Sequence, residues 1–251
     1  MEIKSSTAII TGSGTGIGRA IALAFGRHGA NVVCAARRKA KLEETVRLIE
    51  AEGGVGLAVP TDVTERAQVR AMVAAALDRF GRIDLLFNNA GSFRCIAGVH
   101  EVDPALWWGD VTVNLLGPLL CCREVLPHLI ERDAGIVINM DGGRPVGGTG
   151  YASSKAALME LSRVLVEELK MIGSRVIVLR AGPGFVRTDM TELQANTEAG
   201  RRWIPRTAER IEAGTTLAPE EIARKTIEVV RRATPDWSGK AFGPRTDISE
   251  W

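Results

Sequence analysis

Apolar residues along the chain gather in short runs, separated by longer stretches in which apolar and polar positions alternate with helical spacing. The runs are continuous in Val, Ile and Leu, which is typical of parallel strands buried on both faces. We predict strands at 7–10, 31–35, 55–59, 83–87, 135–140 and 175–179, and a weaker one at 240–242. Helix-length stretches lie between them, among them 41–51, 65–79 and 151–171.

This alternation of strands and helices predicts an α/β fold, with a doubly wound parallel sheet and helices on both faces. The sequence has no internal repeat, low-complexity tract or linker, so we expect one domain over 1–251. The least regular stretch, 182–214, comes late in the chain. A flexible lid over a substrate site is expected there.

Composition narrows the classes of function. Apolar residues make up 45% and charged residues 25% of the chain, and 32 basic against 30 acidic residues leave a formal charge of +2. This balance argues against a disordered chain and gives no reason to expect nucleic acid or an anionic membrane as a partner. The longest uncharged stretches, 5–18 and 111–122, are shorter than the ~20 apolar residues of a spanning helix. Neither the cysteines nor the histidines have metal-ligand spacing, so we expect no metal site and a cytoplasmic protein.

A glycine-rich turn, Thr11-Gly12-Ser13-Gly14-Thr15-Gly16-Ile17-Gly18, directly follows the first predicted strand and precedes a helix expected from about Arg19. Such a turn lets backbone N–H groups approach a pyrophosphate at the helix N-terminus, where the helix dipole favours negative charge. Glycine-rich turns also occur for purely steric reasons, so the turn alone is a weak signal.

The end of the second predicted strand indicates which dinucleotide is bound. Binders of NAD usually carry an acidic residue there, which accepts hydrogen bonds from the ribose hydroxyl. This chain instead has Arg37, Arg38 and Lys39, and no acid before Glu43. Because an arginine fork matches a phosphate, the sequence favours NADP(H), with NAD(H) possible.

Tyr151 is the only tyrosine in the chain, and Lys155 follows it four residues later at the start of a predicted helix. Residues four apart share a helix face, so the phenol and the ammonium can point into one cleft. A nearby cation stabilises tyrosinate, and we therefore expect Lys155 to lower the pKa of Tyr151.

With these residues the chain resembles the single-domain branch of the short-chain dehydrogenase/reductase family, over essentially its whole length. The resemblance implies the sheet order 3-2-1-4-5-6-7. It rests on the glycine turn, on Asp62, on the Asn88-Asn89-Ala90-Gly91 motif, on Asn114, on the Tyr151 and Lys155 pair, and on a Pro183-Gly184-Phe185-Val186 segment with Thr188. The cofactor-binding residues expected are Gly12, Ser13, Thr15, Gly16, Ile17, Gly18, Arg37, Arg38, Asp62, Val63, Asn89, Ala90, Gly91, Tyr151, Lys155, Pro183, Gly184, Val186 and Thr188.

The resemblance also implies a reaction: hydride transfer between nicotinamide and a carbonyl or carbinol carbon. Tyr151 would act as the general acid or base. Lys155 would lower the pKa of Tyr151 and bind the nicotinamide ribose, and Asn114 would hold a water that links Lys155 to solvent. Relatives are usually dimers or tetramers, so a homodimer or homotetramer is expected.

One residue of the family pattern is missing. The family has a serine about a dozen positions before the tyrosine, yet no serine occurs between Glu131 and Gly150. Asp141 and Gly142 stand where the family often has two serines. Asp141 could replace the hydroxyl if it were protonated, Arg144 could polarise the carbonyl or pair with Asp141, and Thr149 is badly placed. Alternatively, Asp141 merely caps a turn and no donor remains.

Two classes of function therefore remain open. The first is an NADP(H)-dependent oxidoreductase acting on a small organic molecule, with Tyr151, Lys155, Asn114 and Asp141 as catalytic residues. The second is a catalytically weak or inactive dinucleotide-binding sensor or scaffold, because the serine is missing. A third option, a dehydratase or epimerase of the longer-chain branch, is not expected, because the glycine spacing argues against it and we expect no C-terminal substrate domain.

Overall fold

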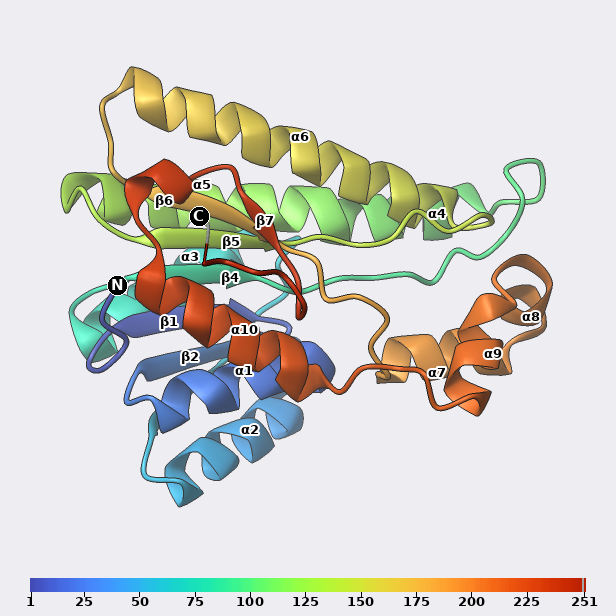
Figure 1. Ribbon diagram of the computed structural model, residues 1–251, viewed down its shortest axis with the longest axis horizontal. Coiled ribbons are helices and arrows are strands. Elements are labelled where there is room, and N and C mark those ends of the chain that lie inside the picture. Colours follow the sequence, from blue (N-terminus) through green and yellow to red (C-terminus); the bar gives the residue numbers. More distant parts are fainter. Residues whose placement is uncertain (250) are drawn as a thin grey trace.

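The computed structural model describes residues 1–249 and residue 251. At its centre lies a seven-stranded parallel sheet (Figure 1). The strands are β1 (Thr7–Thr11), β2 (Asn31–Ala36), β3 (Val55–Pro60), β4 (Leu85–Asn88), β5 (Ile136–Met140), β6 (Ile177–Ala181) and β7 (Ala241–Phe242). Their order is β3-β2-β1-β4-β5-β6-β7. The expected fold class and strand order are confirmed.

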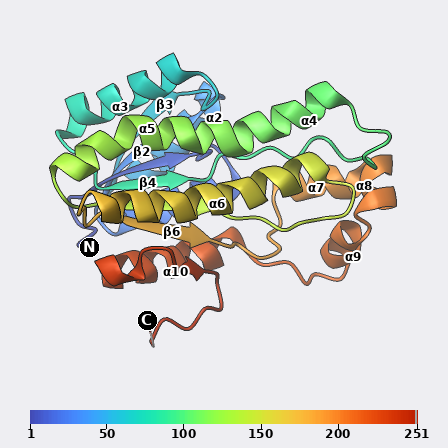
Figure 2. The same ribbon diagram turned by 90° about the horizontal axis from the view of Figure 1, so that it is seen from above.

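Helices cover both faces of this sheet (Figure 2). One layer holds α1 (Gly16–Arg27), α2 (Lys39–Ala51) and α10 (Pro219–Arg232). The other holds α3 (Arg66–Phe80), α5 (Gly117–Glu131) and α6 (Thr149–Met171), with α4 (Pro104–Val111) and the π-helical turn η1 (Thr112–Leu116) leading into α5. A short 3-10 helix, η2 (Pro235–Trp237), precedes β7.

Two hydrophobic cores lie on the two faces of the sheet. Neighbouring residues of one strand alternate between them: Ile9 packs in the core under α3 and α5, whereas Ile10 packs in the core under α1 and α10. This explains why the central strands have no polar side, as expected from their continuous apolar runs. The edge strand β3 differs from that expectation, because only its β2 side is paired and its residues are half-buried or exposed.

The stretch expected as an irregular lid contains three short helices: α7 (Asp189–Asn196), α8 (Glu198–Trp203) and α9 (Arg206–Glu212). They lie beyond the carboxyl ends of the strands (Figure 1), and α8 contacts the loop that precedes α4 through the Arg202–Glu101 ion pair. Helix α7 begins with a capping box, in which Thr188 and Thr191 satisfy each other's backbone N–H groups. The stretch 182–214 is thus more regular than the sequence pattern indicates, because each helix is too short to show clear periodicity. Its role as a lid remains a prediction.

The helices α4, η1 and α5 form one continuous stretch, Pro104–Glu131, of 28 residues. Its most apolar window has a mean hydropathy of 1.2, so length and composition alone would allow it to cross a membrane. In this structure α4 packs against α6, and α5 packs against α3 and the sheet. Such packing is typical of a core helix. The expectations of a cytoplasmic protein without a membrane partner remain predictions.

Candidate active site

The glycine-rich turn lies at the carboxyl edge of the sheet, between β1 and α1, as expected. Helix α1 begins at Gly16, earlier than predicted, and its N-cap residue Thr15 makes no side-chain capping bond. The first N–H groups of the helix therefore have no capping side chain and face a cleft of about 290 Å³. This end of the helix is suited to bind a phosphate group.

Asn89 fixes the shape of the turn. Its Nδ2 donates to the carbonyl oxygen of Thr11 at 2.9 Å, and the Thr11 hydroxyl accepts from the backbone N–H groups of Asn89 and Ala90. Gly12 has φ +69°, and a Cβ there would lie 2.7 Å from Nδ2 of Asn89. Only glycine fits at this position, and the close approach leaves the backbone of the turn open to the cleft.

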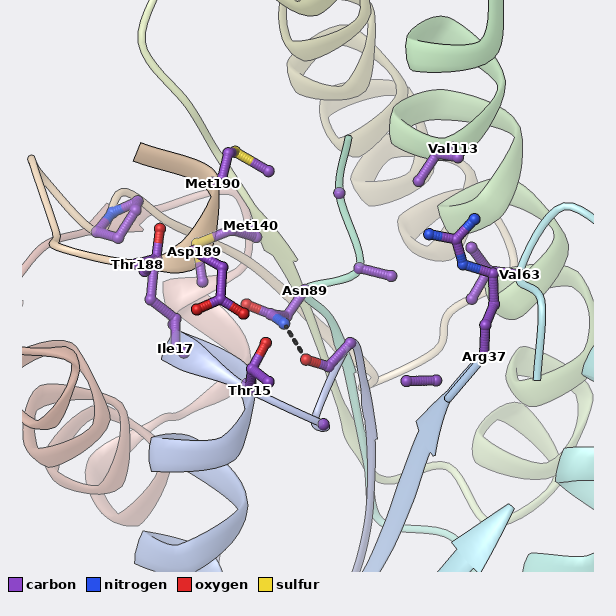
Figure 3. Close-up of a pocket in the computed structure, with 18 of the residues that line it drawn as sticks. Thr15, Ile17, Arg37, Val63, Asn89, Val113, Met140, Thr188, Asp189 and Met190 are labelled. Carbon is purple, nitrogen blue, oxygen red and sulfur yellow. Dashed lines mark hydrogen bonds between the residues drawn. The ribbon is translucent and has the colours of Figure 1, made fainter. Parts of the chain in front are cut away.

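Arg37 and Arg38, which are predicted to bind the cofactor phosphate, line the same cleft. Asp62 and Val63 line it as well. Figure 3 shows Arg37 reaching from the end of β2 towards Val63 and Val113, on the side of the cleft opposite Thr188, Asp189 and Met190. Arg38 lies 3.9 Å from the carboxylate of Asp189 and is largely exposed. Among the described residues, Arg37 has no ion-pair partner. It therefore offers a free guanidinium to an anion in the cleft.

Tyr151 and Lys155 open onto this cleft from α6, as their spacing predicts. The Lys155 ammonium lies 5.8 Å from the centre of the Tyr151 ring and donates to the Met140 carbonyl at 2.8 Å. Burial lowers the pKa of Lys155 to about 8, although the charge of Asp141 opposes this. The Tyr151 ring also stacks on Phe93, with the ring centres 4.6 Å apart and the planes 15° apart.

The expected lowering of the Tyr151 pKa is wrong for the protein alone. Burial raises the pKa of Tyr151 to about 12, and the negative charges of Asp141 and Asp110 add to the rise. Burial disfavours the charged tyrosinate form. Its effect on the pKa of Tyr151 therefore exceeds the opposite effect of the nearby Lys155 ammonium.

Asn114 lies in the π-helical turn and is fully buried. Its Nδ2 donates to the Ser92 carbonyl at 2.7 Å and to the Ser154 hydroxyl at 3.1 Å, while Oδ1 accepts from the Ser92 N–H. Both amide hydrogens are thus used within the protein. A water expected at Asn114 would have to be held by an oxygen of this residue, and that role remains a prediction.

Gly142 is one of the two positions at which the family pattern often has a serine. A Cβ placed on Gly142 would collide with the Tyr151 hydroxyl. The phenol of Tyr151 therefore packs directly on the backbone of this loop. A serine at position 142 would add a hydroxyl group but would also collide with the phenol.

Asp141 forms an ion pair with Arg180, not with Arg144 as one hypothesis had it. The Arg180 guanidinium lies 3.1 Å from the Asp141 carboxylate, and both side chains are mostly buried. Arg144 instead contacts the Met159 sulfur, and the Thr149 hydroxyl accepts from the Trp107 indole at 3.2 Å. Burial raises the pKa of Asp141, while the positive charges of Arg180 and Lys155 act in the opposite direction.

Most of the predicted site residues line one cleft. The exceptions are Ser13, Asn114, Gly184 and Val186, which lie outside its lining. Sequence reasoning missed Gly14, Ala36, Thr61, Val113, Met140, Asp189 and Met190 in the lining, and also Arg180 and Phe93 beside the reacting groups. Gly14 belongs to the glycine turn that the sequence marks, but nothing in the sequence pairs Arg180 with Asp141.

Comparisons with known proteins agree with this geometry. A family model described as short chain dehydrogenase matches residues 6–199. The short chain dehydrogenase MYCFIDRAFT_6125 of Pseudocercospora fijiensis is 37% identical over 195 residues, which cover 75% of this chain and 62% of that protein. The 3-oxoacyl-[acyl-carrier-protein] reductase FabG of Thermotoga maritima is 32% identical over 252 residues, covering 97% of each chain.

Solved structures with this fold include complexes with both dinucleotides. A short chain dehydrogenase/reductase from Burkholderia phymatum in complex with NAD superposes with a TM-score of 0.85 at 27% identity, covering 98% of this chain and 90% of that one. A variant of actinorhodin polyketide ketoreductase with NADPH gives a TM-score of 0.84 at 25% identity, covering 97% and 96%. These neighbours indicate a nicotinamide dinucleotide as the cofactor. They do not show whether this chain prefers NAD(H) or NADP(H).

Proposed function

The chain belongs to the short-chain dehydrogenase family and is an NAD(P)-dependent oxidoreductase, and we propose that it uses NADP(H) to interconvert a carbonyl and a secondary alcohol in a small organic molecule. One observation carries the proposal. Tyr151 and Lys155 open onto the same cleft as the glycine turn and the free guanidinium of Arg37. Groups for proton transfer and for binding a phosphorylated dinucleotide therefore meet in one place.

The residues of the cleft fit a dinucleotide phosphate. The N-terminus of α1 would hold the pyrophosphate, Asp62 and Val63 would bind the adenine, and Arg37 would bind the ribose phosphate with Arg38 beside it. Lys155 would bind the nicotinamide ribose, and Pro183 and Thr188 would contact the nicotinamide. The absence of an acid at the end of β2 supports NADP(H), because a carboxylate there would repel the added phosphate.

The bound cofactor supplies or accepts the hydride at the reacting carbon. In the reductive direction, Tyr151 donates its phenolic proton to the carbonyl oxygen, so the carbonyl becomes an alcohol. Lys155 lies close enough to stabilise the tyrosinate that remains, provided that it is charged. In the oxidative direction Tyr151 removes the hydroxyl proton.

Asp141 stands next to these groups, and it substitutes for the missing serine only in its protonated form, whereas its ionised form acts on Tyr151. Paired with Arg180, its carboxylate accepts hydrogen bonds and raises the pKa of Tyr151, which keeps the phenol protonated for reduction. Only a protonated Asp141 would donate to the substrate oxygen, and burial acts in that direction.

One observation favours the rival function, a dinucleotide-binding protein with little or no turnover. No serine hydroxyl faces the Tyr151 side of the loop, and the one acidic substitute is engaged by Arg180. Loss of one donor to the substrate oxygen typically lowers the rate by roughly 100- to 1,000-fold. Such a loss weakens an oxidoreductase without abolishing it.

The test follows NADPH absorbance during incubation with a panel of aliphatic ketones, aryl ketones and a 3-oxoacyl thioester. The wild type is expected to oxidise NADPH only when a carbonyl compound is present. Tyr151→Phe keeps the ring on Phe93 and removes the hydroxyl, so turnover should fall at least ~100-fold while NADPH binding remains. Ser153→Ala, which removes an exposed hydroxyl from the same helix, is the matched control. NADPH binding without turnover on any carbonyl would instead favour the sensor or scaffold.

A further inference from the structure

Asp141 presents its carboxylate to the cleft from a rigid position. It directly follows β5, and its backbone N–H donates to the Ala181 carbonyl at 2.8 Å, which continues the pairing of β5 with β6. The preceding carbonyl, that of Met140, accepts from the Lys155 ammonium at 2.8 Å. The backbone at Asp141 is therefore held by β6 and by α6, next to the reacting groups.

The two oxygens of this carboxylate have different surroundings. Oδ2 accepts from the Arg180 guanidinium at 3.1 Å, and Arg180 belongs to the neighbouring strand β6. Oδ1 accepts no hydrogen bond from the part of the chain that the structure describes, and it is not sealed off from the cleft that Asp141 lines. The side chain is only 16% exposed. Oδ1 is thus an acceptor for a molecule in the cleft, with little access to bulk water.

This acceptor lies beside the phenol that transfers the proton. The next residue, Gly142, lies so close to the Tyr151 hydroxyl that a Cβ there would collide with it. After burial, the charge of Asp141 contributes most to raising the pKa of Tyr151. A carbonyl oxygen that is being reduced gains negative charge, which an unpartnered carboxylate nearby disfavours. A substrate group that donates a hydrogen bond to Asp141 removes this conflict.

The charges around Asp141 indicate which donor fits. Burial raises the pKa of this carboxyl, and the positive charges of Arg180, Lys155 and Arg144 oppose the rise. These cations favour the ionised form, which only accepts hydrogen bonds. They also repel a further cation, such as an ammonium group on the substrate. A neutral hydroxyl group is therefore the donor that suits this carboxylate.

We propose that Asp141, paired with Arg180, is a specificity-determining residue that selects carbonyl compounds with a hydroxyl group on the neighbouring carbon. The inference rests on the proposed oxidoreductase function and gives its substrate class as α-hydroxy ketones, which are reduced to vicinal diols. Reduction adds the cofactor hydride to the carbonyl carbon and the Tyr151 proton to its oxygen, while the adjacent hydroxyl donates to Oδ1 of Asp141. A ketone without that hydroxyl leaves Oδ1 unpaired in the occupied cleft, which costs transition-state binding.

The test compares kcat/KM for hydroxyacetone and butan-2-one, which differ only by a hydroxyl in place of a methyl group, with whichever of NADPH and NADH the wild type uses. The ratio of hydroxyacetone to butan-2-one should be roughly 10- to 100-fold higher in the wild type than in Asp141→Ala, as expected for a hydrogen bond to a charged group. The intrinsic reactivities of the two ketones cancel in this comparison. Val146→Ala, which removes an exposed apolar side chain from the same loop, should keep the wild-type ratio.

Asp141→Ala leaves the Arg180 charge unpaired, so a second variant guards against a failure to fold. Asp141→Leu combined with Arg180→Leu replaces the buried pair by apolar side chains and should lower the ratio as well. An unchanged ratio in a folded Asp141→Ala, or in the double variant, would overturn the proposal.

A wild type that reduces neither ketone would count against the proposed function, and equilibrium binding then decides on Asp141. Quenching of the fluorescence of the bound reduced cofactor should show that the wild type binds hydroxyacetone at least ~10-fold more tightly than butan-2-one. Asp141→Ala should show no such preference. Equal affinities in the wild type, or no binding of hydroxyacetone, would overturn the proposal.

Discussion

At the scale of single residues, the absence of a side chain at Gly142 leaves the space that the Tyr151 hydroxyl occupies. The phenol packs on Gly142, in space that a side chain at that position would fill. This contact between the phenol and Gly142 contributes to the burial that raises the pKa of Tyr151 to about 12. Family chemistry thus cannot be restored simply by replacing the missing hydroxyl.

We therefore expect Gly142→Ser to impair the protein. The added side chain must displace the Tyr151 ring from its stack on Phe93, at a cost of about 1–3 kcal/mol typical of overpacking. Such a cost lowers Tm by roughly 2–12 °C in a chain of this size. Thermal unfolding and the rate of ketone reduction measure both effects, with Gly143→Ser, where a Cβ meets nothing, as the control. A more active variant of unchanged Tm would contradict this account of the site.

The sequence predicts Tyr151, Lys155 and the glycine turn well, because each belongs to a short motif with fixed spacing. It fails for Asp141, since Arg180 stands 39 positions away and is brought near only by the pairing of β5 with β6. It also fails for the Tyr151 pKa. Spacing shows that a cation is near, whereas the cost of burial depends on everything packed around the ring.

At the scale of elements, the site is built where strands end and helices begin. The turn after β1, the end of β2 and the N-terminus of α6 meet at one edge because all strands are parallel. The start of α1 was predicted too late because glycine was taken as part of the turn. In the structure Gly16 and Gly18 already belong to the helix, whose uncapped N–H groups face the cleft.

The free guanidinium at the end of β2 gives a prediction on cofactor choice. Arg37→Ala should raise the KM for NADPH by roughly 10- to 100-fold, as expected for the loss of a charge-assisted hydrogen bond of about 1.5–3 kcal/mol. The KM for NADH should stay nearly constant, because NADH lacks the phosphate. Arg47→Ala, which removes an exposed arginine of α2 outside the cleft, serves as the control. Equal losses for the two cofactors in Arg37→Ala would rule out phosphate recognition by this residue.

At the scale of the whole molecule, the pattern of apolar runs predicts the layers of the fold, and the resemblance adds the strand order. The sequence does not predict the oligomeric contact in the same way, because it does not show which surface a second chain would cover. Large apolar side chains are exposed on the continuous helix Pro104–Glu131, including Leu106, Trp108, Leu116 and Leu119. An exposed apolar face of this kind fits the expected homodimer or homotetramer.

We expect the protein to sediment at two or four times the mass of one chain. Leu119→Arg should lower that mass, because a charge would be buried in the contact between chains. Leu48→Arg, at an exposed apolar position of α2 in the opposite layer, should leave the mass unchanged. Analytical ultracentrifugation at several concentrations distinguishes the cases. A wild type that stays monomeric, or a Leu119→Arg variant that assembles as the wild type does, would exclude this face as the contact.

The central claim is that Tyr151 becomes a working acid and base when the cofactor joins it in the cleft. Because the chain has a single tyrosine, the tyrosinate absorbance band reports on this residue alone. Without cofactor we expect a midpoint near pH 12, and a lower one in Asp141→Asn, since the Asp141 carboxylate raises the pKa of Tyr151. With NADP⁺ bound, the positive nicotinamide should lower the midpoint further. A midpoint that NADP⁺ leaves unchanged would mean that the cofactor does not reach the phenol, and the claim would be wrong.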